Sequence, residues 1–301
     1  GRVSALAALG LSARKPFPRA DYLWAKGNVD RVSRGKDVMR CLVENLPEGD
    51  VRVLDVGAGT LQMVEHVTTC VVKYAKKELK SYVAVDVDEE LLRKDQSEKL
   101  KHVQRVVADV FEYQPPDGEP FSLVVANSFA DLASPARVAE LFQKLVPENA
   151  LLYLPTTFAG KTWLEPPLSK ADGELLSDDR IFQQYHDCLA LSGQFFDVDV
   201  LKAALDDAGF DLLKEDVSDW HVPLGTRFAT YLAHFVASAL VPTFLADRTP
   251  DDRLSDDALR GLRWTRAFRA ETWDDSFSPY LPRTLCVYNA DLLFRRRPPA
   301  S

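Results

Sequence analysis

The chain has 301 residues, 46% of them hydrophobic and 27% charged, which is typical of a globular protein with one large domain or with a core domain and a cap. Its formal net charge of −8 argues against a nucleic-acid duplex as the main partner. The four cysteines are far apart in the sequence, without metal-ligand or redox spacing. We therefore expect free thiols, no metal site and a cytoplasmic protein.

The first fifty residues are predicted to form a helical arm. Residues 1–20 contain four basic side chains and no acidic one. We interpret this pattern as a basic helix or arm; the remnant of an organelle transit peptide is the alternative, and it would change the expected location. Residues 20–46 have a helical pattern, and we expect them to pack over the edge of a sheet where a ligand binds.

Strand and helix patterns alternate between residues 51 and 155. Short apolar runs predict strands, and the segments between them predict helices. Such alternation is typical of a parallel sheet with helices on both faces. The predicted strands are residues 51–56, 81–87, 103–108, 121–126 and 150–154, and the predicted helices are residues 61–79, 89–100 and 135–145.

The rest of the chain departs from simple alternation. Residues 156–194 are rich in Pro, Gly, Asp and Trp, and predict an insertion with one short helix near residues 179–191. The apolar run 229–246 contains His234 and Pro242 and is short for a membrane span, so we favour a core helix. The remaining predicted elements are a helix over 199–208, a sixth strand over 210–217, a mostly helical stretch over 227–270 and a final strand over 284–294.

These elements predict an α/β protein with a Rossmann-like sheet of seven strands, mostly parallel, in which the last strand is antiparallel. A helical N-terminal arm and two insertions are expected to form a cap. The expected divisions are residues 1–50 for the arm, 51–220 for the core with its insertion 156–198, 221–283 for the helical cap insertion, and 284–301 for the final core strand and the tail.

The segment that joins the first predicted strand to its helix reads Asp55-Val56-Gly57-Ala58-Gly59. Glycine lets the backbone turn sharply and approach a ligand closely, and in open parallel sheets ligands bind beyond the carboxyl ends of the strands. A carboxylate after the second strand can accept hydrogen bonds from both hydroxyls of a ribose. A polar residue lies at the end of the second predicted strand, Asp86, and directly after the third and fourth, Asp109 and Asn127.

Dinucleotide binding is the closest competing interpretation of this motif. A dinucleotide site requires a third glycine three residues after Gly59, so that the pyrophosphate sits on the helix N-terminus. That position is Gln62. The motif also starts about fifty residues into the chain, behind a helical segment, and both facts count against NAD.

Four segments together resemble the class I S-adenosylmethionine-dependent methyltransferases, over roughly residues 51–210 and the last strand. They are Leu54-Asp55-Val56-Gly57-Ala58-Gly59-Thr60, Ala84-Val85-Asp86-Val87-Asp88, Val107-Ala108-Asp109-Val110-Phe111 and Phe121-Ser122-Leu123-Val124-Val125-Ala126-Asn127. One departure is Leu61, where many members have a third glycine.

The resemblance implies S-adenosylmethionine as cofactor and assigns its contacts. By resemblance, the glycine segment, with Ala58, approaches the methionine moiety, and Asp86 holds the ribose. The full set of implied cofactor-binding residues is Asp55, Gly57, Ala58 and Gly59 in the turn, Asp86 and Val87 after the second strand, Asp109 and Val110 at the adenine edge, and Asn127 and Ser128 below the sulfonium.

Candidates for catalysis and acceptor binding come from the insertions and the arm. Methyl transfer from a sulfonium mainly requires alignment in a dry site, and a base only if the acceptor arrives protonated. His186, beside Tyr185, is the leading catalytic candidate, and His221 is the second; packing roles are the alternative for both. Segments around these residues also resemble a poorly characterised bacterial group of the same superfamily, which suggests that they form one pocket. The acceptor-binding candidates are Tyr22, Trp24, Thr157, Trp163, Asp219 and Trp220.

The sequence thus predicts a methyltransferase that acts on an O, N or S atom of a small-molecule acceptor, with no nucleic-acid or membrane partner. The oligomeric state stays open. Three alternatives remain: a nicotinamide-dependent oxidoreductase, an aminopropyltransferase that uses the decarboxylated cofactor, and a non-catalytic cofactor-binding regulatory subunit.

Overall fold

The computed structural model describes residues 17–95, 97–116, 120–156, 160–170, 173–191, 197–272 and 283–298. The chain divides into two compact units, and it passes between them five times. Unit 1 comprises residues 1–29, 161–195 and 220–287, and unit 2 comprises residues 30–160, 196–219 and 288–301.

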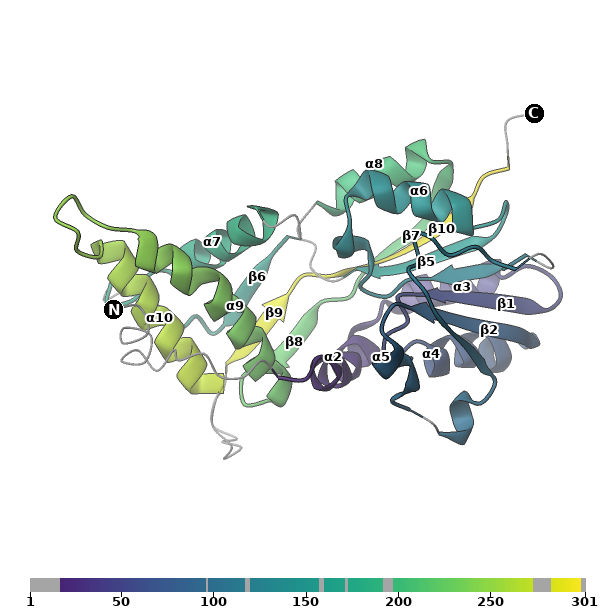
Figure 1. Ribbon diagram of the computed structural model, residues 1–301, viewed down its shortest axis with the longest axis horizontal. Helices are drawn as coiled ribbons and strands as arrows, with labels where there is room; N and C mark the ends of the chain where they lie inside the picture. The colour runs from purple at the N-terminus through teal and green to yellow at the C-terminus, as the bar shows by residue number, and fades with distance from the viewer. Residues whose placement is uncertain are drawn as a thin grey trace. The chain divides into compact units, whose positions relative to one another are not determined.

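Unit 2 contains a seven-stranded sheet (Figure 1). Its strand order is β3-β2-β1-β4-β5-β10-β7, and every pair is parallel except those of β10, which runs antiparallel to both neighbours. This is the predicted Rossmann-like arrangement, which is confirmed. The strands are β1 (Val51–Val56), β2 (Leu79–Asp86), β3 (Val103–Val107), β4 (Leu123–Val125), β5 (Leu151–Thr156), β7 (Phe210–Val217) and β10 (Ala290–Arg296).

Helices cover both faces of this sheet because its strands are apolar on both sides. The side chains of β1 pack on both faces of the sheet. Val51 and Val53 belong to one hydrophobic cluster, and Leu54 and Val56 belong to the other. The first cluster includes α3 (Lys36–Asn45), α4 (Val64–Thr68) and the π-helical η1 (Thr69–Tyr74), and the second includes α6 (Pro135–Leu145) and α8 (Val198–Asp207). Short helices α5 (Glu89–Arg93), η2 (Glu98–Leu100) and η3 (Ala130–Leu132) occupy the connections.

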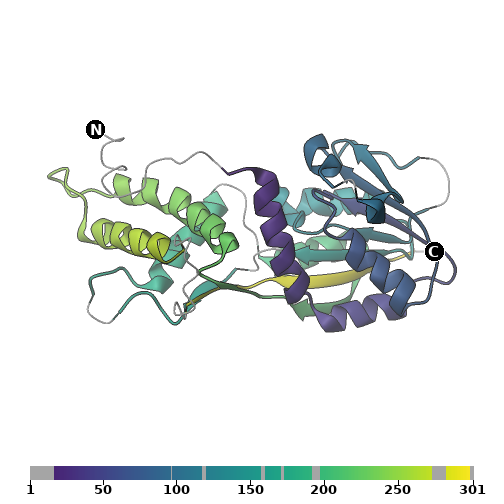
Figure 2. The ribbon, with the colours of Figure 1, turned by 90° about the horizontal axis from the view of Figure 1, so that it is seen from below.

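Unit 1 combines a small antiparallel sheet with helices. The sheet has the order β6-β9-β8, from β6 (Thr162–Glu165), β8 (Trp220–Pro223) and β9 (Thr284–Val287). The helices are α7 (Asp178–Leu191), α9 (Arg227–Ala246) and α10 (Asp256–Thr272). Figures 1 and 2 show α9 and α10 side by side, and Gly261 on α10 permits this approach because a Cβ there would overlap the Phe244 ring of α9.

Helix α9 coincides with the apolar run for which a core helix is predicted. It is long and apolar enough to cross a membrane by length and composition alone. However, 56% of its most apolar 18-residue window is buried inside the protein, and α10 and α7 pack against it. A core helix of a globular unit has these properties.

Several predicted elements have different bounds in the structure. Residues 135–145 and 210–217 form α6 and β7 as predicted, but residues 61–79 form turns, α4 and η1 instead of one helix, and residues 89–100 break after Arg93. The arm divides into α2 (Arg19–Ser33) and α3, because the Gly35 N–H donates to Asp291 Oδ2 (2.9 Å) rather than within a helix. The small sheet of unit 1 was not predicted.

The predicted final strand is also divided, into β9 and β10. Asn289 N donates to Asp219 Oδ1 (3.0 Å) and Asn289 O accepts from Ser218 N (3.0 Å), so the ladder is interrupted between the two strands. The domain boundaries differ accordingly: residues 284–287 belong to unit 1 rather than to the core, and the arm is split between residues 29 and 30.

Candidate cofactor-binding site

The turn after β1 has the backbone conformation that its glycines permit. Gly57 has φ +66° and Gly59 has φ +49°, in the left-handed region that L-residues disfavour. The N–H groups of Gly57 and Ala58 both donate to Val85 O on β2 (2.9 and 3.1 Å). Leu61, at the position where the resemblance expects glycine, also has a left-handed φ of +63°. The chain therefore keeps a glycine-like conformation there, at a cost of about 1–2 kcal/mol.

Asp86 closes this turn from the neighbouring strand. It is the last residue of β2 and is only 7% exposed. Its Oδ2 accepts from Gly59 N (2.8 Å) and its Oδ1 accepts from Asp88 N (2.9 Å). Each oxygen can accept a further hydrogen bond, so the carboxylate is a fixed pair of acceptors beside the glycine turn. Such a pair of acceptors fits the two hydroxyls of a ribose, which would donate to it.

The other predicted cofactor contacts lie at the same edge of the sheet. Val87 follows Asp86 and is 69% exposed, which leaves an apolar surface for a flat base. Asp109 is exposed after β3 and its Oδ1 accepts from Phe111 N (2.9 Å), while Val110 is buried.

Two more predicted contacts follow β4. Asn127 Nδ2 donates to Asp30 Oδ2 (3.2 Å), and Ser128, with φ +52°, donates its N–H to Pro155 O (2.8 Å). Residues from four neighbouring connections therefore converge at the carboxyl edge of unit 2, as the polar strand ends indicate.

Asp55 differs from the other acidic residues of the site because it is buried. It is 1% exposed, and its Oδ2 accepts from the Tyr82 hydroxyl (2.7 Å). Burial, with a smaller contribution from the charge of Asp86, raises the pKa of Asp55 from 3.8 to about 7, against the lowering effects of Tyr82 and Arg34. The side chain is thus bonded inside the unit, beneath the turn.

This pKa predicts a stability change with pH. Between about pH 4 and pH 7 folded Asp55 retains a proton that the unfolded chain has lost, so its contribution to the free energy of unfolding decreases as pH rises through that window. We expect Asp55→Asn to remove this decrease. Urea unfolding of both proteins at about pH 5 and about pH 7.5 measures it. Equal changes in the two proteins would contradict a raised pKa for Asp55.

The catalytic candidates all lie in unit 1. His186, on α7, is buried with Nε2 3.2 Å from Thr162 Oγ1, and burial lowers its pKa to about 4, so it is neutral at pH 7. Burial raises the pKa of Tyr185 to about 12. His221, on β8, is exposed. Tyr185 and His186 are neighbours (ring centroids 5.9 Å apart), and their catalytic roles stay predictions.

The acceptor-binding candidates are divided between the units. Asp219 is in unit 2, bonded to Asn289 N, and Thr157 lies outside the described residues. Unit 1 contains the rest: Trp163, whose Nε1 donates to Glu165 Oε1 (2.6 Å); buried Trp220, with Lys26 Nζ 5.3 Å from its ring centroid; Trp24, 42% exposed; and Tyr22, stacked on Phe228 at 5.8 Å.

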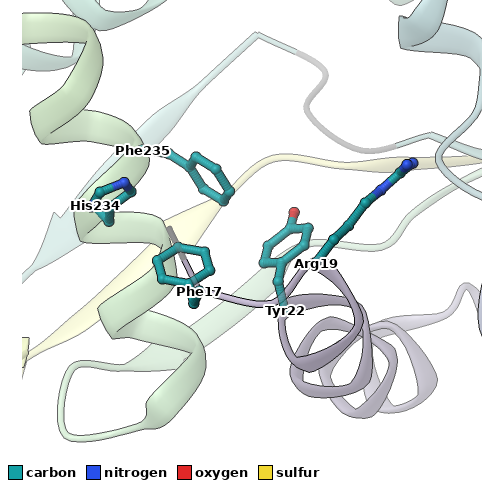
Figure 3. A pocket seen from close by; sticks show the side chains of 5 residues that line it. All are labelled: Phe17, Arg19, Tyr22, His234 and Phe235. Atoms are coloured by element: carbon teal, nitrogen blue, oxygen red, sulfur yellow. The ribbon is translucent and has the colours of Figure 1, made fainter. Parts of the chain in front are cut away.

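Tyr22 also lines an aromatic pocket in unit 1 (Figure 3). The cavity has about 200 Å³ and is lined by Phe17, Arg19, Tyr22, His234 and Phe235. Phe17 lies between Tyr22 and His234 in Figure 3, with its ring centroid 5.1 Å from that of His234. Three of these residues were not singled out from the sequence. The adjacent aromatic residues His234 and Phe235 in the middle of α9 were the available signal.

The fold of unit 2 and the geometry of its edge define a class. The strand order with an antiparallel β10, the left-handed glycine turn and the carboxylate ending β2 are those of the class I S-adenosylmethionine-dependent methyltransferase fold. No protein-family model matches the chain, and no curated protein matches it in sequence. Among the described residues there is no group of three or more His, Cys, Asp or Glu side chains that could hold a metal ion.

Solved structures resemble the chain in fold at low sequence identity. A candidate methyltransferase from Bacillus halodurans is 14% identical with a TM-score of 0.50, and the match covers 88% of this chain and 100% of that one. A candidate type II methyltransferase from Anaeromyxobacter dehalogenans is 18% identical (TM-score 0.49; 87% and 97% covered). The [4+2]-cyclase SpnF is 17% identical (TM-score 0.44; 89% and 81% covered). The likeness to the Bacillus halodurans protein shows the fold alone.

Proposed function

We propose that the protein is an S-adenosylmethionine-dependent methyltransferase that acts on an O, N or S atom of a small molecule. The observation that carries this proposal is the Asp86 carboxylate, held beside the left-handed turn by the N–H groups of Gly59 and Asp88. A ribose with both hydroxyls free matches these acceptors. The turn, with Gln62 where a dinucleotide site has its third glycine, fits S-adenosylmethionine better than NAD.

The residues of unit 2 would bind and orient the cofactor, which supplies an already activated methyl group. Asp86 would hold the ribose, the exposed Val87 would flank the adenine, and Asn127, kept in position by Asp30, would lie near the sulfonium. Alignment rather than acid–base chemistry then limits the rate. Transfer of an already activated methyl group to an aligned acceptor requires no metal ion.

Most of the residues predicted to bind the acceptor lie in unit 1. Tyr22 and the pocket that it lines offer aromatic and apolar contacts to a small molecule. His186 is neutral at pH 7, but a pKa of about 4 makes it a weak general base. The identity of the acceptor atom is left open by these contacts.

Isothermal calorimetry with S-adenosylhomocysteine and with NAD tests the cofactor. We expect S-adenosylhomocysteine to bind and NAD to give no heat of binding, because the turn lacks the pyrophosphate site. Binding of NAD without S-adenosylhomocysteine would overturn the proposal. Mass spectrometry of ligands that copurify with the protein is an independent measurement, and an acceptor bound with the cofactor would argue against a purely regulatory subunit.

A further inference from the structure

Arg34 is a partly buried cation in unit 2 whose hydrogen bonding is incomplete. It lies between α2 and α3, directly before Gly35. Its Nη2 donates to Met63 Sδ (2.9 Å), which is a weak acceptor. Its Nε is buried and has no hydrogen-bond partner among the described residues. A buried charged donor without a good acceptor is unfavourable unless a ligand completes its bonding.

The carboxyl groups around Arg34 do not supply that acceptor. Asp55 Oδ2 takes the Tyr82 hydroxyl, and Asp291 Oδ2 takes the N–H of Gly35 and the Tyr153 hydroxyl. The charge of Arg34 lowers the pKa of both carboxyl groups, yet burial, the larger effect, leaves the pKa of each above its usual value. Both carboxyl groups already accept hydrogen bonds from other donors, and no hydrogen bond from Arg34 to either is seen among the described residues.

Arg34 lies at the carboxyl edge of the sheet, at the end of β1. Met63 follows the glycine turn, and Asp55 precedes it. Asp291 is the second residue of β10, which begins at this same edge because it runs antiparallel to β5. The bond to Met63 and the charge interactions with Asp55 and Asp291 locate the guanidinium near the turn, on the face of the sheet that α4 and η1 cover.

The position of the ribose determines which end of the cofactor approaches Arg34. If Asp86 on β2 holds the ribose and the residues after β3 hold the adenine, the rest of the molecule extends the other way along the strand order, towards β1 and β4. The methionine moiety lies at that end, and its carboxylate is the anionic group that S-adenosylmethionine carries there.

We propose that Arg34 binds the carboxylate of the methionine moiety, an inference that rests on the proposed function. A guanidinium binds a carboxylate through two parallel hydrogen bonds, so one such ligand would supply the acceptor that Nε lacks. Arg34 would then select the carboxylate-bearing cofactor over its decarboxylated form. This selection favours methyl transfer over aminopropyl transfer, which requires the decarboxylated cofactor.

The test compares two ligands that differ only in this group, S-adenosylhomocysteine and its decarboxylated analogue, by calorimetry. We expect the wild-type protein to bind S-adenosylhomocysteine about tenfold or more tightly than the analogue. Arg34→Met should remove this preference by weakening S-adenosylhomocysteine alone. Methionine is chosen because an apolar side chain of similar length leaves no unpaired polar group behind.

Two further variants separate recognition from folding. Arg40→Met removes an exposed arginine of α3 that pairs with Asp37 (3.2 Å), and it should leave both affinities unchanged. Arg34→Lys keeps the charge and should keep part of the preference, even if Arg34→Met proves unstable in thermal unfolding. Equal binding of the two ligands to the wild-type protein, or equal weakening of both by Arg34→Met, would overturn the inference alone. Binding of neither ligand to the wild-type protein would overturn the proposed function as well.

Discussion

Replacement of Asp86 by alanine is expected to weaken binding of S-adenosylhomocysteine by about tenfold or more. The carboxylate would lose its bonds to the ribose hydroxyls, and hydrogen bonds to charged groups contribute about 1.5–3 kcal/mol each. It would also release Gly59 N, to which Oδ2 is bonded at 2.8 Å, so the turn itself would be less well held. Both effects lower the affinity for S-adenosylhomocysteine.

Calorimetry on Asp86→Ala measures this loss, with two companion variants. Asp86→Asn retains one acceptor oxygen and should give an intermediate affinity. Asp95→Ala removes another carboxylate that accepts a backbone N–H, that of Ser97 (2.8 Å), away from the turn, and should bind as the wild-type protein does. If folded Asp86→Ala keeps the wild-type dissociation constant, Asp86 does not hold the ribose.

The second large effect is expected for Gly57→Ala. At φ +66° an L-residue is disfavoured by about 1–2 kcal/mol. In addition, a Cβ at this position would lie 2.7 Å from Cδ2 of Phe129, a buried ring in the core cluster of the α6 and α8 face. The turn or the ring must therefore move. We expect a lower free energy of unfolding and a loss of S-adenosylhomocysteine binding that exceeds the loss for a glycine with room around it.

Gly49 provides the matched control, because it has φ +89° and no atom of the described residues lies within 4 Å of an added Cβ. Gly49→Ala should therefore show the conformational cost alone, in urea unfolding, and no change in cofactor affinity. Phe129→Leu in the Gly57→Ala background should restore part of the stability, since it removes the ring that the new methyl group meets. Additive losses in this double variant would show that the ring is not the cause.

The periodicity of the sequence predicted the elements whose contacts are local or repeated. Helix α6 has an apolar stripe, Ser134 as its N-cap and Pro135 at its start, and its bounds were predicted correctly. Strand β7 was predicted with equal accuracy because α8 ends shortly before Gly209. The edge proposed to bind the cofactor could also be located, since residues that follow parallel strands meet at one edge whatever the details of packing.

Where distant segments compete for the same backbone groups, the sequence pattern was insufficient. The break between α2 and α3 depends on Asp291, 256 residues away, which accepts the Gly35 N–H, and a Cβ at Gly35 would also meet Asp216. The final strand divides at Asn289 because Ser218 and Asp219 take its backbone groups. The residues adjacent in sequence to Gly35 and Asn289 do not indicate that distant side chains and backbone groups bond to them.

The fold class of unit 2, the position of the glycine turn and the carboxylate that ends β2 were predictable from the sequence, because they follow from alternation, glycine and the parallel sheet. What lies beneath the turn was not predictable in this way. The burial of Asp55 and the Nε of Arg34, which has no partner among the described residues, arise from side chains of the α2–α3 connection, β1, β2, β5 and β10. Charge compensation in a protein interior depends on distances between such groups, and a linear sequence does not contain those distances.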